Sequence, residues 1–380
     1  MRIGILTLPL HTNYGGILQA YALQTVLERM GHDVCLIEKT PFLHLPTWKA
    51  PLVYGKRVLK NMIGRPCPIF YEQQLNRKIR YENPIIRQNT DKFINKYIKR
   101  RIVNDFSEIK EQDFDAIVVG SDQVWRPRYF CGLTHSRIEN AYLKFTNNWS
   151  IERVAYAVSY GTDEWEYTDK QEHQCAALLK KFNAVSVREN SACGLCKEHF
   201  GVDVKHVIDP TMLLHVEDYI KLVESAEVPR SPGNMLSYVL DETEEKTVLI
   251  EKVANTKGLV PFRVNSKVED KYAQLSERIQ PSVEQWLRGF YDAEFVITDS
   301  FHACVFSILY NKPFIAIGNS GRGLSRFTSL LSMFDLDDRI LLNLTRDRQY
   351  KDINWTKVNT IMDDRREQAI DFLKLALSRD

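Results

Sequence analysis

The stretch EFVITDSFHACVFSILYNKPFIAI, residues 294–317, decides the fold. A short apolar run leads to Asp299 and Ser300, and the segment after them is apolar almost all round. Aspartate and serine are good helix N-cap residues, and a helix that is apolar on every side is a buried one. Because Pro313 disfavours helix in the residue before it, the helix stops there. The apolar run 314–317 then fits a strand buried on both faces, so the stretch predicts a parallel strand-helix-strand unit.

His302 is the polar residue that stands out in this unit. It falls in the first turn of the predicted helix, directly after the carboxyl end of a strand. Ligands of open α/β sheets bind at that edge. We therefore expect His302 to be a functional residue; a neutral histidine that packs or caps at a strand end is the structural alternative.

The bulk properties are those of an ordinary globular protein. The chain has 380 residues, 44% hydrophobic and 26% charged, with a formal net charge of +2. This length allows two domains, and the small net charge gives no argument for a nucleic-acid partner. Seven scattered cysteines suit a reducing compartment better than a disulfide framework. The first residues are typical of a strand and a glycine turn, and no apolar run approaches a membrane span, so we expect a cytoplasmic protein.

The rest of the chain repeats the same alternation of strands and helices. A strand near residues 2–8, a helix near 17–30 and a strand near 32–38 open it, and the pattern resumes at residue 115. The segment PRSPGN at 229–234 is the best linker. The sequence predicts an α/β fold with two Rossmann-like domains facing across a cleft. The expected domains are 1–228 and 229–354, followed by a helix at 355–380 that can pack back on the first domain.

Residues 41–113 break this pattern and are expected to form a helical insertion in the first domain. Positions 56–101 hold thirteen Lys or Arg against three Asp or Glu. One interpretation is a solvated helical face. The other is an electropositive surface for an anionic membrane or a lipid-linked acceptor, with the protein peripheral at the inner face of the membrane.

Five motifs in order resemble the polysaccharide pyruvyl transferases. They are NYGGILQAYALQ (13–24), VVGSDQVW (118–125), SVREN (186–190), VIDPTMLL (207–214) and ITDSFHACVFSILYNKPF (297–314). The resemblance implies a GT-B-like fold of two facing domains. It also implies transfer of pyruvate from phosphoenolpyruvate, as co-substrate, to two hydroxyls of a sugar as a cyclic ketal. Such enzymes act in capsular, exopolysaccharide or cell-wall glycan synthesis. The acceptor would be a sugar or a lipid-linked oligosaccharide, and no metal or other cofactor is expected.

The chemistry assigns roles to residues at strand ends. Ketal formation needs an acid for the methylene carbon, for which His302 is the candidate, and a base for the attacking hydroxyl, for which Asp122 is the candidate. Asp122 is equally well read as a turn cap. Better-known members of the family carry an arginine two residues before this histidine, whereas this chain has Ser300. The donor's charge must then be met from elsewhere: Arg322 and Arg326 in a glycine-rich loop, or Arg188.

The remaining candidates line the predicted cleft. Asp299 is expected to cap the helix or to orient His302, and Asp209 before a proline is expected to be a turn or cap residue. The substrate-binding candidates of the first domain are Asn13, Tyr14, Gly15, Gly16, Ser121, Gln123 and Trp125. The four at 13–16 form a predicted loop whose glycines let the backbone approach a ligand. Ser121, Gln123 and Trp125 offer a hydroxyl, an amide and an aromatic face suited to a sugar.

Two other functions remain open at this point. One is a GT-B glycosyltransferase that uses a nucleotide sugar, which release of nucleotide instead of phosphate would reveal. The other is a degenerate glycan-binding protein of this fold, which the departure at Ser300 favours.

Overall fold

The computed structural model describes residues 1–43, 45–318, 323–344 and 350–378. Two sheets of parallel strands form the centres of two domains. This confirms the predicted α/β fold of two Rossmann-like domains facing each other. None of the helices in the described ranges is both long and apolar enough to cross a bilayer.

The first domain is built on seven strands. Their spatial order is β3 (Arg100–Val103), β2 (Asp33–Lys39), β1 (Arg2–Leu6), β4 (Ala116–Val119), β5 (Glu152–Val158), β6 (Ala184–Val187) and β7 (Lys205–His206). The central strands are continuous apolar runs because helices cover both faces of a parallel sheet. These helices are α1 (Tyr14–Arg29), α6 (Pro127–Thr134), α7 (Asp169–Leu179) and α8 (Asn190–Leu195).

α1 begins at Tyr14, earlier than the expected start near residue 17. Gly15 and Gly16 are therefore the first turn of a helix and not a loop. The backbone of Asn13 is extended at the N-cap, and the helix continues from Tyr14 through both glycines. Glycine lowers helix propensity only by about 1 kcal/mol, which the packing of a buried helix readily offsets.

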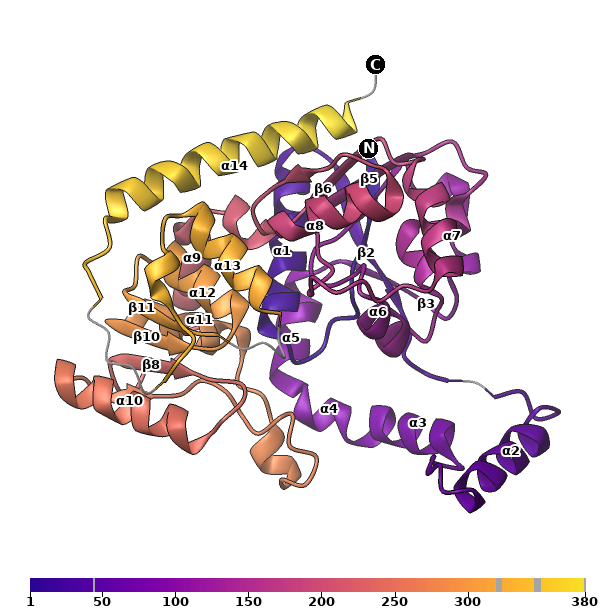
Figure 1. Ribbon diagram of the computed structural model, residues 1–380, viewed down its shortest axis with the longest axis horizontal. Helices are drawn as coiled ribbons and strands as arrows, with labels where there is room; N and C mark the ends of the chain where they lie inside the picture. The colour runs from indigo at the N-terminus through magenta and orange to yellow at the C-terminus, as the bar shows by residue number, and fades with distance from the viewer. Residues whose placement is uncertain (44, 319–322, 345–349, 379–380) are drawn as a thin grey trace.

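The insertion is shorter than predicted, because β3 pairs with β2. Residues 41–113 were expected to be helical, but β3 is a basic edge strand that the apolar pattern does not reveal. The helices before it are α2 (Ala50–Met62), α3 (Tyr71–Tyr81), α4 (Asn83–Ile86) and α5 (Gln88–Tyr97). Figure 1 shows α2 and α3 projecting away from both sheets, with α4 and α5 leading back to the body.

The second domain is built on five strands in the order β12 (Ile340–Leu341), β11 (Phe314–Ile317), β10 (Phe295–Thr298), β8 (Met235–Tyr238) and β9 (Pro261–Phe262). Its helices are α9 (Val216–Ser225), α10 (Glu244–Lys257), α11 (Val283–Asp292), α12 (Phe301–Leu309) and α13 (Leu324–Met333). The stretch 294–317 is β10, α12 and β11, as its pattern predicts. Every residue of α12 is buried.

Short helices complete the chain. They are the 3₁₀ helices Phe106–Glu108, Glu111–Asp113, Ile138–Tyr142, Lys144–Thr146, Pro210–Leu213 (η6), Leu275–Arg278 and Asp337–Arg339, and a π-helical turn at Cys196–Phe200.

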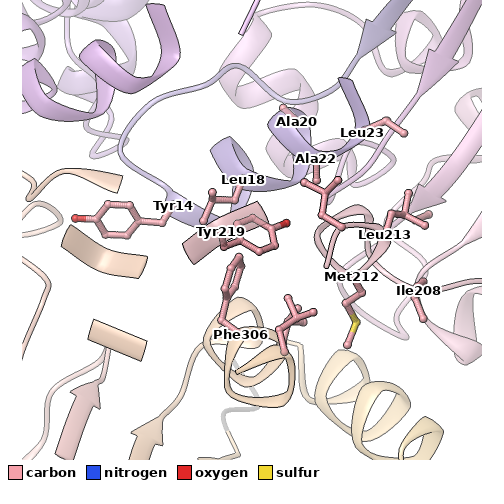
Figure 2. Close-up of a cluster of buried hydrophobic side chains, with 14 of the residues drawn as sticks. Tyr14, Leu18, Ala20, Ala22, Leu23, Ile208, Met212, Leu213, Tyr219 and Phe306 are labelled. Atoms are coloured by element: carbon pink, nitrogen blue, oxygen red, sulfur yellow. The ribbon is translucent and has the colours of Figure 1, made fainter. Parts of the chain in front are cut away.

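An apolar core joins the two domains. Figure 2 shows Leu18 and Leu23 of α1, Met212 of η6, Tyr219 of α9 and Phe306 of α12 in one cluster. Across the boundary, the ring of Tyr14 of α1 stacks on that of Trp286 of α11, with centroids 5.3 Å apart. Because this contact is apolar and continuous with both cores, it holds the facing sheet edges at a defined separation.

The C-terminal helix α14 (Trp355–Leu377) leaves the second domain and lies along the first (Figure 1). Phe372 packs against Tyr156 of β5 with ring centroids 6.3 Å apart. The Arg366 guanidinium donates to the Met212 carbonyl at 2.9 Å. α14 therefore packs on the first domain, and its buried face is part of the apolar core.

Candidate functional site

A pocket of about 310 Å³ lies between the two domains. The loop after β1, the start of α1 and the turn after β4 form its wall on the first domain. The start of α12 and part of α13 form its wall on the second. Nine of the predicted residues line it: Asn13, Gly15, Gly16, Asp122, Gln123, Asp299, Ser300, His302 and Arg326. Arg322 lies outside the described residues.

His302 lies against Gly15 across the domain boundary. A Cβ built on Gly15 would come within 1.9 Å of Nδ1 of His302 and 2.2 Å of its Cγ. The imidazole therefore occupies the space that a side chain at position 15 would need. This close approach is the physical reason for glycine in the first turn of α1, where helix propensity alone disfavours it.

The other ring nitrogen of His302 faces a carboxylate. Nε2 is buried and lies 3.6 Å from Oδ2 of Asp209, beyond ordinary hydrogen-bonding distance, and it makes no hydrogen bond within the described part of the chain. Asp209 follows β7 and is fully buried. This contact places the start of α12, in the second domain, against the segment that follows β7 in the first domain.

Asp209 is held as an anion by its neighbours. Burial alone would raise the pKa of this carboxyl. The contact with His302 and the charge of Arg188 outweigh that effect and hold the pKa well below its usual range. Oδ1 also accepts from the backbone N–H of Thr211 at 3.0 Å. The expected cap role is therefore present, but the contact with His302 was not predicted from the sequence.

Asp299 does not orient His302, contrary to one expectation. Its oxygens accept from the backbone N–H of Leu240 and Asp241 and from the ammonium of Lys246, the last at 2.7 Å. Asp299 lies at the end of β10, beside the end of the neighbouring strand β8. Its carboxylate is therefore used to join the ends of neighbouring strands, and Asp209 is the carboxylate that meets the histidine.

Arg188 is not a pocket residue, which corrects its assignment to the substrate. Its side chain is 1% exposed, and its guanidinium pairs with Asp209 at 2.7 Å and with Asp122 and Glu189 at 3.5 Å each. Burial lowers its pKa, but Asp209, Glu189 and Asp122 outweigh burial and raise the pKa above its ordinary value. Because these carboxylates surround it, Arg188 is a structural counter-charge behind the pocket wall.

Arg326 is the described arginine that reaches the pocket. It lies in the first turn of α13, buried, with its guanidinium 5.7 Å from the ring centre of Phe301. Burial, and then the charge of Arg188, lower its pKa to about 10, so it remains a cation near neutral pH. The charges of Glu189 and Asp122 offset part of this effect, and an anionic ligand would offset more of the desolvation and of the repulsion from Arg188.

Asp122 and Gln123 form the pocket wall at the end of β4. Asp122 has a φ of 60°, in the left-handed region that aspartate tolerates better than most residues. Its backbone carbonyl accepts from the Ser159 N–H at 3.0 Å, and its carboxylate lies within 3.5 Å of Arg188. Gln123 Oε1 accepts from Arg126 at 3.1 Å. These bonds hold both side chains in place.

Besides Arg188, three candidates of the first domain lie outside the pocket lining. Trp125 is fully buried, stacks on Tyr142 at 4.6 Å and donates its indole N–H to the Ala141 carbonyl, so it has no free face for a sugar. The Ser121 hydroxyl donates to the Ala157 carbonyl at 2.6 Å. Both were expected near the ligand because they follow β4, but the chain turns them into the core.

Tyr14 is the third of these residues, and it links the two domains. Its hydroxyl donates to the Pro281 carbonyl at 2.8 Å and its ring stacks on Trp286 of α11 at 5.3 Å. Burial raises its pKa well above the usual value for tyrosine. It is therefore a residue of the domain interface that supports the pocket from behind.

Some pocket residues were not anticipated. His11, Tyr129 and Gln280 line it, and none of them was among the residues predicted from the sequence. Burial, with the nearby charge of Arg87, lowers the pKa of His11 to about 4, so this imidazole is neutral near pH 7. The polar run HTN after the first strand was the available signal for His11. No sequence signal points to Gln280, because the insertion brings it there.

The described residues contain no group of three or more His, Cys, Asp and Glu side chains that could hold a metal ion. The charged and imidazole side chains that line the pocket are instead His11, His302, Arg326, Asp122, Glu269 and Asp299. This set suits a small anion together with a hydroxylated ligand.

Comparison with known proteins identifies relatives by sequence. The family model described as polysaccharide pyruvyl transferase matches residues 13–321. No curated protein matches the sequence significantly. The match covers His302, Asp209, Gly15 and Asp122, which meet around the pocket.

Solved structures of similar topology share little sequence. UDP-GlcNAc 2-epimerase from Neisseria meningitidis bound to UDP-GlcNAc has a TM-score of 0.46 at 9% identity, over 100% of this chain and 95% of that one. UDP-GlcNAc 2-epimerase from Methanocaldococcus jannaschii has a TM-score of 0.45 at 12% identity, over 96% and 92%. The E. coli heptosyltransferase WaaC with ADP has a TM-score of 0.37 at 13% identity, over 86% and 90%. The assignment of a family therefore rests on the sequence match.

Proposed function

The chain belongs to the polysaccharide pyruvyl transferase family, and from this we propose that it moves pyruvate from phosphoenolpyruvate onto two hydroxyls of a glycan sugar as a cyclic ketal. The observation that carries the proposal is the pair His302 and Asp209. An ionised, buried carboxylate lies 3.6 Å from Nε2, and the ring itself lines the pocket beside Gly15. A carboxylate on one ring nitrogen orients an imidazole and stabilises its protonated form while the other nitrogen transfers a proton.

In the proposed reaction His302 is the acid. It gives a proton to the methylene carbon of phosphoenolpyruvate, which becomes the methyl group of the ketal, and the neighbouring carbon becomes an oxocarbenium-like centre. One sugar hydroxyl attacks this carbon. The bond to phosphate then breaks, and the second hydroxyl attacks the same carbon. Asp122 takes the proton of the first hydroxyl and passes it to the departing phosphate, and the proton of the second hydroxyl returns to His302, so the enzyme ends as it began.

Charge around the pocket supports an anionic donor. Arg326 provides a fork of N–H donors that fits a phosphate or a carboxylate. Phe301 and His302 open α12 after the N-cap residue Ser300, and the dipole at the start of a helix favours an anion. With Ser300 in place of the arginine of better-known members, Arg326 is our candidate for the cation that binds the donor.

The acceptor would lie against the first domain. Asp122 is the proposed base for the attacking hydroxyl, and Asn13 and Gln123 would hydrogen-bond neighbouring hydroxyls. We include in the proposal that the acceptor is a sugar or a lipid-linked oligosaccharide. Its product would enter a capsular, exopolysaccharide or cell-wall glycan. The cell location included in the proposal is cytoplasmic, peripheral at the inner face of an anionic membrane.

Mass spectrometry of products tests the reaction directly. A panel of galactosides, mannosides and hexosaminides is incubated with phosphoenolpyruvate, and the expected product carries one added pyruvate less one water, with one phosphate released. His302→Ala is expected to lower turnover by roughly 10²–10⁴-fold while the protein stays folded. His173→Ala, at an exposed histidine of α7, is the matched control and is expected to leave turnover unchanged.

Two results would overturn the proposal. One is release of nucleotide from a sugar nucleotide in the presence of the same acceptors, which indicates a glycosyltransferase. The other is near-normal turnover by His302→Ala, which removes the acid from the mechanism.

A further inference from the structure

The tip of the insertion carries an apolar stripe that faces outward. We call residues 48–71 the arm; it comprises Trp48, α2 and the loop that leads into α3. Leu52, Leu59 and Met62 of α2 are 76%, 60% and 79% exposed. Together with the exposed Trp48 and Ile63 they recur at spacings of four, seven, three and one residues, which places them on one face of a helix. Large apolar side chains gathered on one exposed face mark an interaction site.

The other face of α2 is already occupied by its own chain. Tyr54 packs against Phe70 with ring centroids 5.2 Å apart. Arg57 pairs with Glu72 of α3 at 2.6 Å and also donates to the Ile69 carbonyl at 2.8 Å. These contacts fix the orientation of α2 on α3. The apolar stripe is therefore presented to the outside by specific packing of the opposite face.

The charge around the stripe has a single sign. Residues 40–71 contain five Lys or Arg and neither Asp nor Glu. Arg57 forms the ion pair with Glu72, and the other four basic residues are exposed: Lys49, Lys56, Lys60 and Arg65. The Lys49 ammonium lies 4.7 Å above the ring of Trp48. A helix with exposed aromatic and aliphatic residues on one face and lysines beside them fits the boundary between anionic headgroups and acyl chains.

We propose that the arm docks on an anionic lipid bilayer, with Trp48, Leu52, Leu59, Met62 and Ile63 entering the headgroup region. The helices α4 and α5, which connect the arm to the body of the protein, also contact a residue of the pocket. Gln280, which lines the pocket, receives a hydrogen bond from Asn89 at the end of the insertion, and its own backbone N–H donates to the Ile86 carbonyl at 3.0 Å. Docking would therefore tether this wall of the pocket to the membrane through α3, α4 and α5.

Co-sedimentation of the full chain with vesicles tests this proposal without any use of catalysis, so its outcome is independent of pyruvyl transfer. Vesicles of phosphatidylcholine alone are compared with vesicles of equal parts phosphatidylcholine and phosphatidylglycerol. We expect binding to the anionic vesicles, weakened by high salt, and little binding to the neutral ones.

The variant Leu52→Glu/Met62→Glu is expected to lower the partition onto anionic vesicles at least about tenfold, because two large apolar side chains are replaced by anions. No residue of α2 is buried, so the variant leaves the core intact. The matched control is Val248→Glu/Leu375→Glu, which adds the same two charges at exposed apolar positions of α10 and α14. We expect it to bind as the wild type does.

Three results would overturn the proposal. They are equal binding to both kinds of vesicle, equal loss of binding in the two double variants, and an absence of vesicle binding at low salt. If sedimentation velocity instead shows a dimer that dissociates in Leu52→Glu/Met62→Glu, a second copy of the chain covers the stripe and the membrane proposal is wrong.

Discussion

Replacing Gly15 by alanine should displace the proposed catalytic histidine while adding only one methyl group. The new Cβ would lie 1.9 Å from Nδ1 of His302, whereas real Cβ contacts essentially never fall below 3.0 Å. The ring must therefore retreat by about 1 Å. A misplacement of this size in a catalytic group costs on the order of 10² in rate. We expect Gly15→Ala to lower kcat about 100-fold.

The effect on stability is the balance of two opposing terms. Alanine in a helix is more favourable than glycine by about 1 kcal/mol, and overpacking a buried site costs about 1–3 kcal/mol. The net loss in the free energy of unfolding is thus at most about 2 kcal/mol. When His302 is also replaced by alanine, the clash disappears, and Gly15→Ala should become stabilising by up to about 1 kcal/mol.

Urea unfolding of the wild type, both single variants and the double variant measures this coupling, which we expect to be about 1–3 kcal/mol. Gly194→Ala, at an exposed glycine of α8, is the control. Its Cβ would meet nothing within 4 Å, so turnover should not change and stability should not fall. Equal effects of Gly15→Ala on stability with and without His302 would refute the reasoning, as would normal turnover of Gly15→Ala.

Three further predictions concern the charges around the pocket. Asp209→Asn keeps an acceptor for the Thr211 N–H but removes the negative charge that faces His302 and Arg188. We expect kcat to fall by about 10²-fold or more and the pH profile of kcat to shift. An unchanged pH profile would contradict the assignment. Arg326→Lys replaces a planar fork of N–H donors by a point charge, so the KM for phosphoenolpyruvate should rise about tenfold. Initial rates and calorimetric titration measure this effect. The same KM in the variant and the wild type would show that Arg326 is not in the donor site. His11 is expected to make stability depend on pH. Its folded-state pKa of about 4 lies below the unfolded value of 6.5, so the unfolded chain binds more protons between these values. Its contribution is complete above pH 6.5 and is lost as the pH falls toward 4, and from pH 7 to pH 5 the loss is at most about 2 kcal/mol. Urea unfolding at both pH values should show a smaller loss in His11→Gln, and an equal loss in the two proteins would contradict this.

Local patterns were sufficient for the fold. The apolar runs of β1, β4 and β10 are strands because they are buried on both faces, and the caps and proline around α12 mark its limits. The edge strand β3 was missed because an edge strand with two arginines has no apolar run to reveal it. The start of α1 was misjudged because two glycines in succession resemble a turn.

Whether a candidate residue lines the pocket or lies in the core depends on the direction in which the chain turns after each strand. Residues that follow strand ends were correctly expected near one edge, and Asp122, Gln123, His302 and Arg326 do line the pocket. Ser121 and Trp125 belong to the same segment as Asp122, yet they point into the core. Side chains alternate with a period of two residues in a strand and 3.6 in a helix, but an irregular turn has no such period. Sequence spacing therefore could not separate the pocket residues of this segment from its core residues.

The sequence by itself determined that the chain has two parallel α/β domains, that His302 opens a buried helix at a strand end, and that the chain is related to the polysaccharide pyruvyl transferases. These features depend on contacts between neighbouring residues or on motifs read in order. Only the tertiary structure decided which carboxylate meets His302, which arginine reaches the pocket and why residue 15 is glycine. Asp209 and His302 are far apart in the chain and on different domains, and their meeting depends on how the two sheets pack against each other.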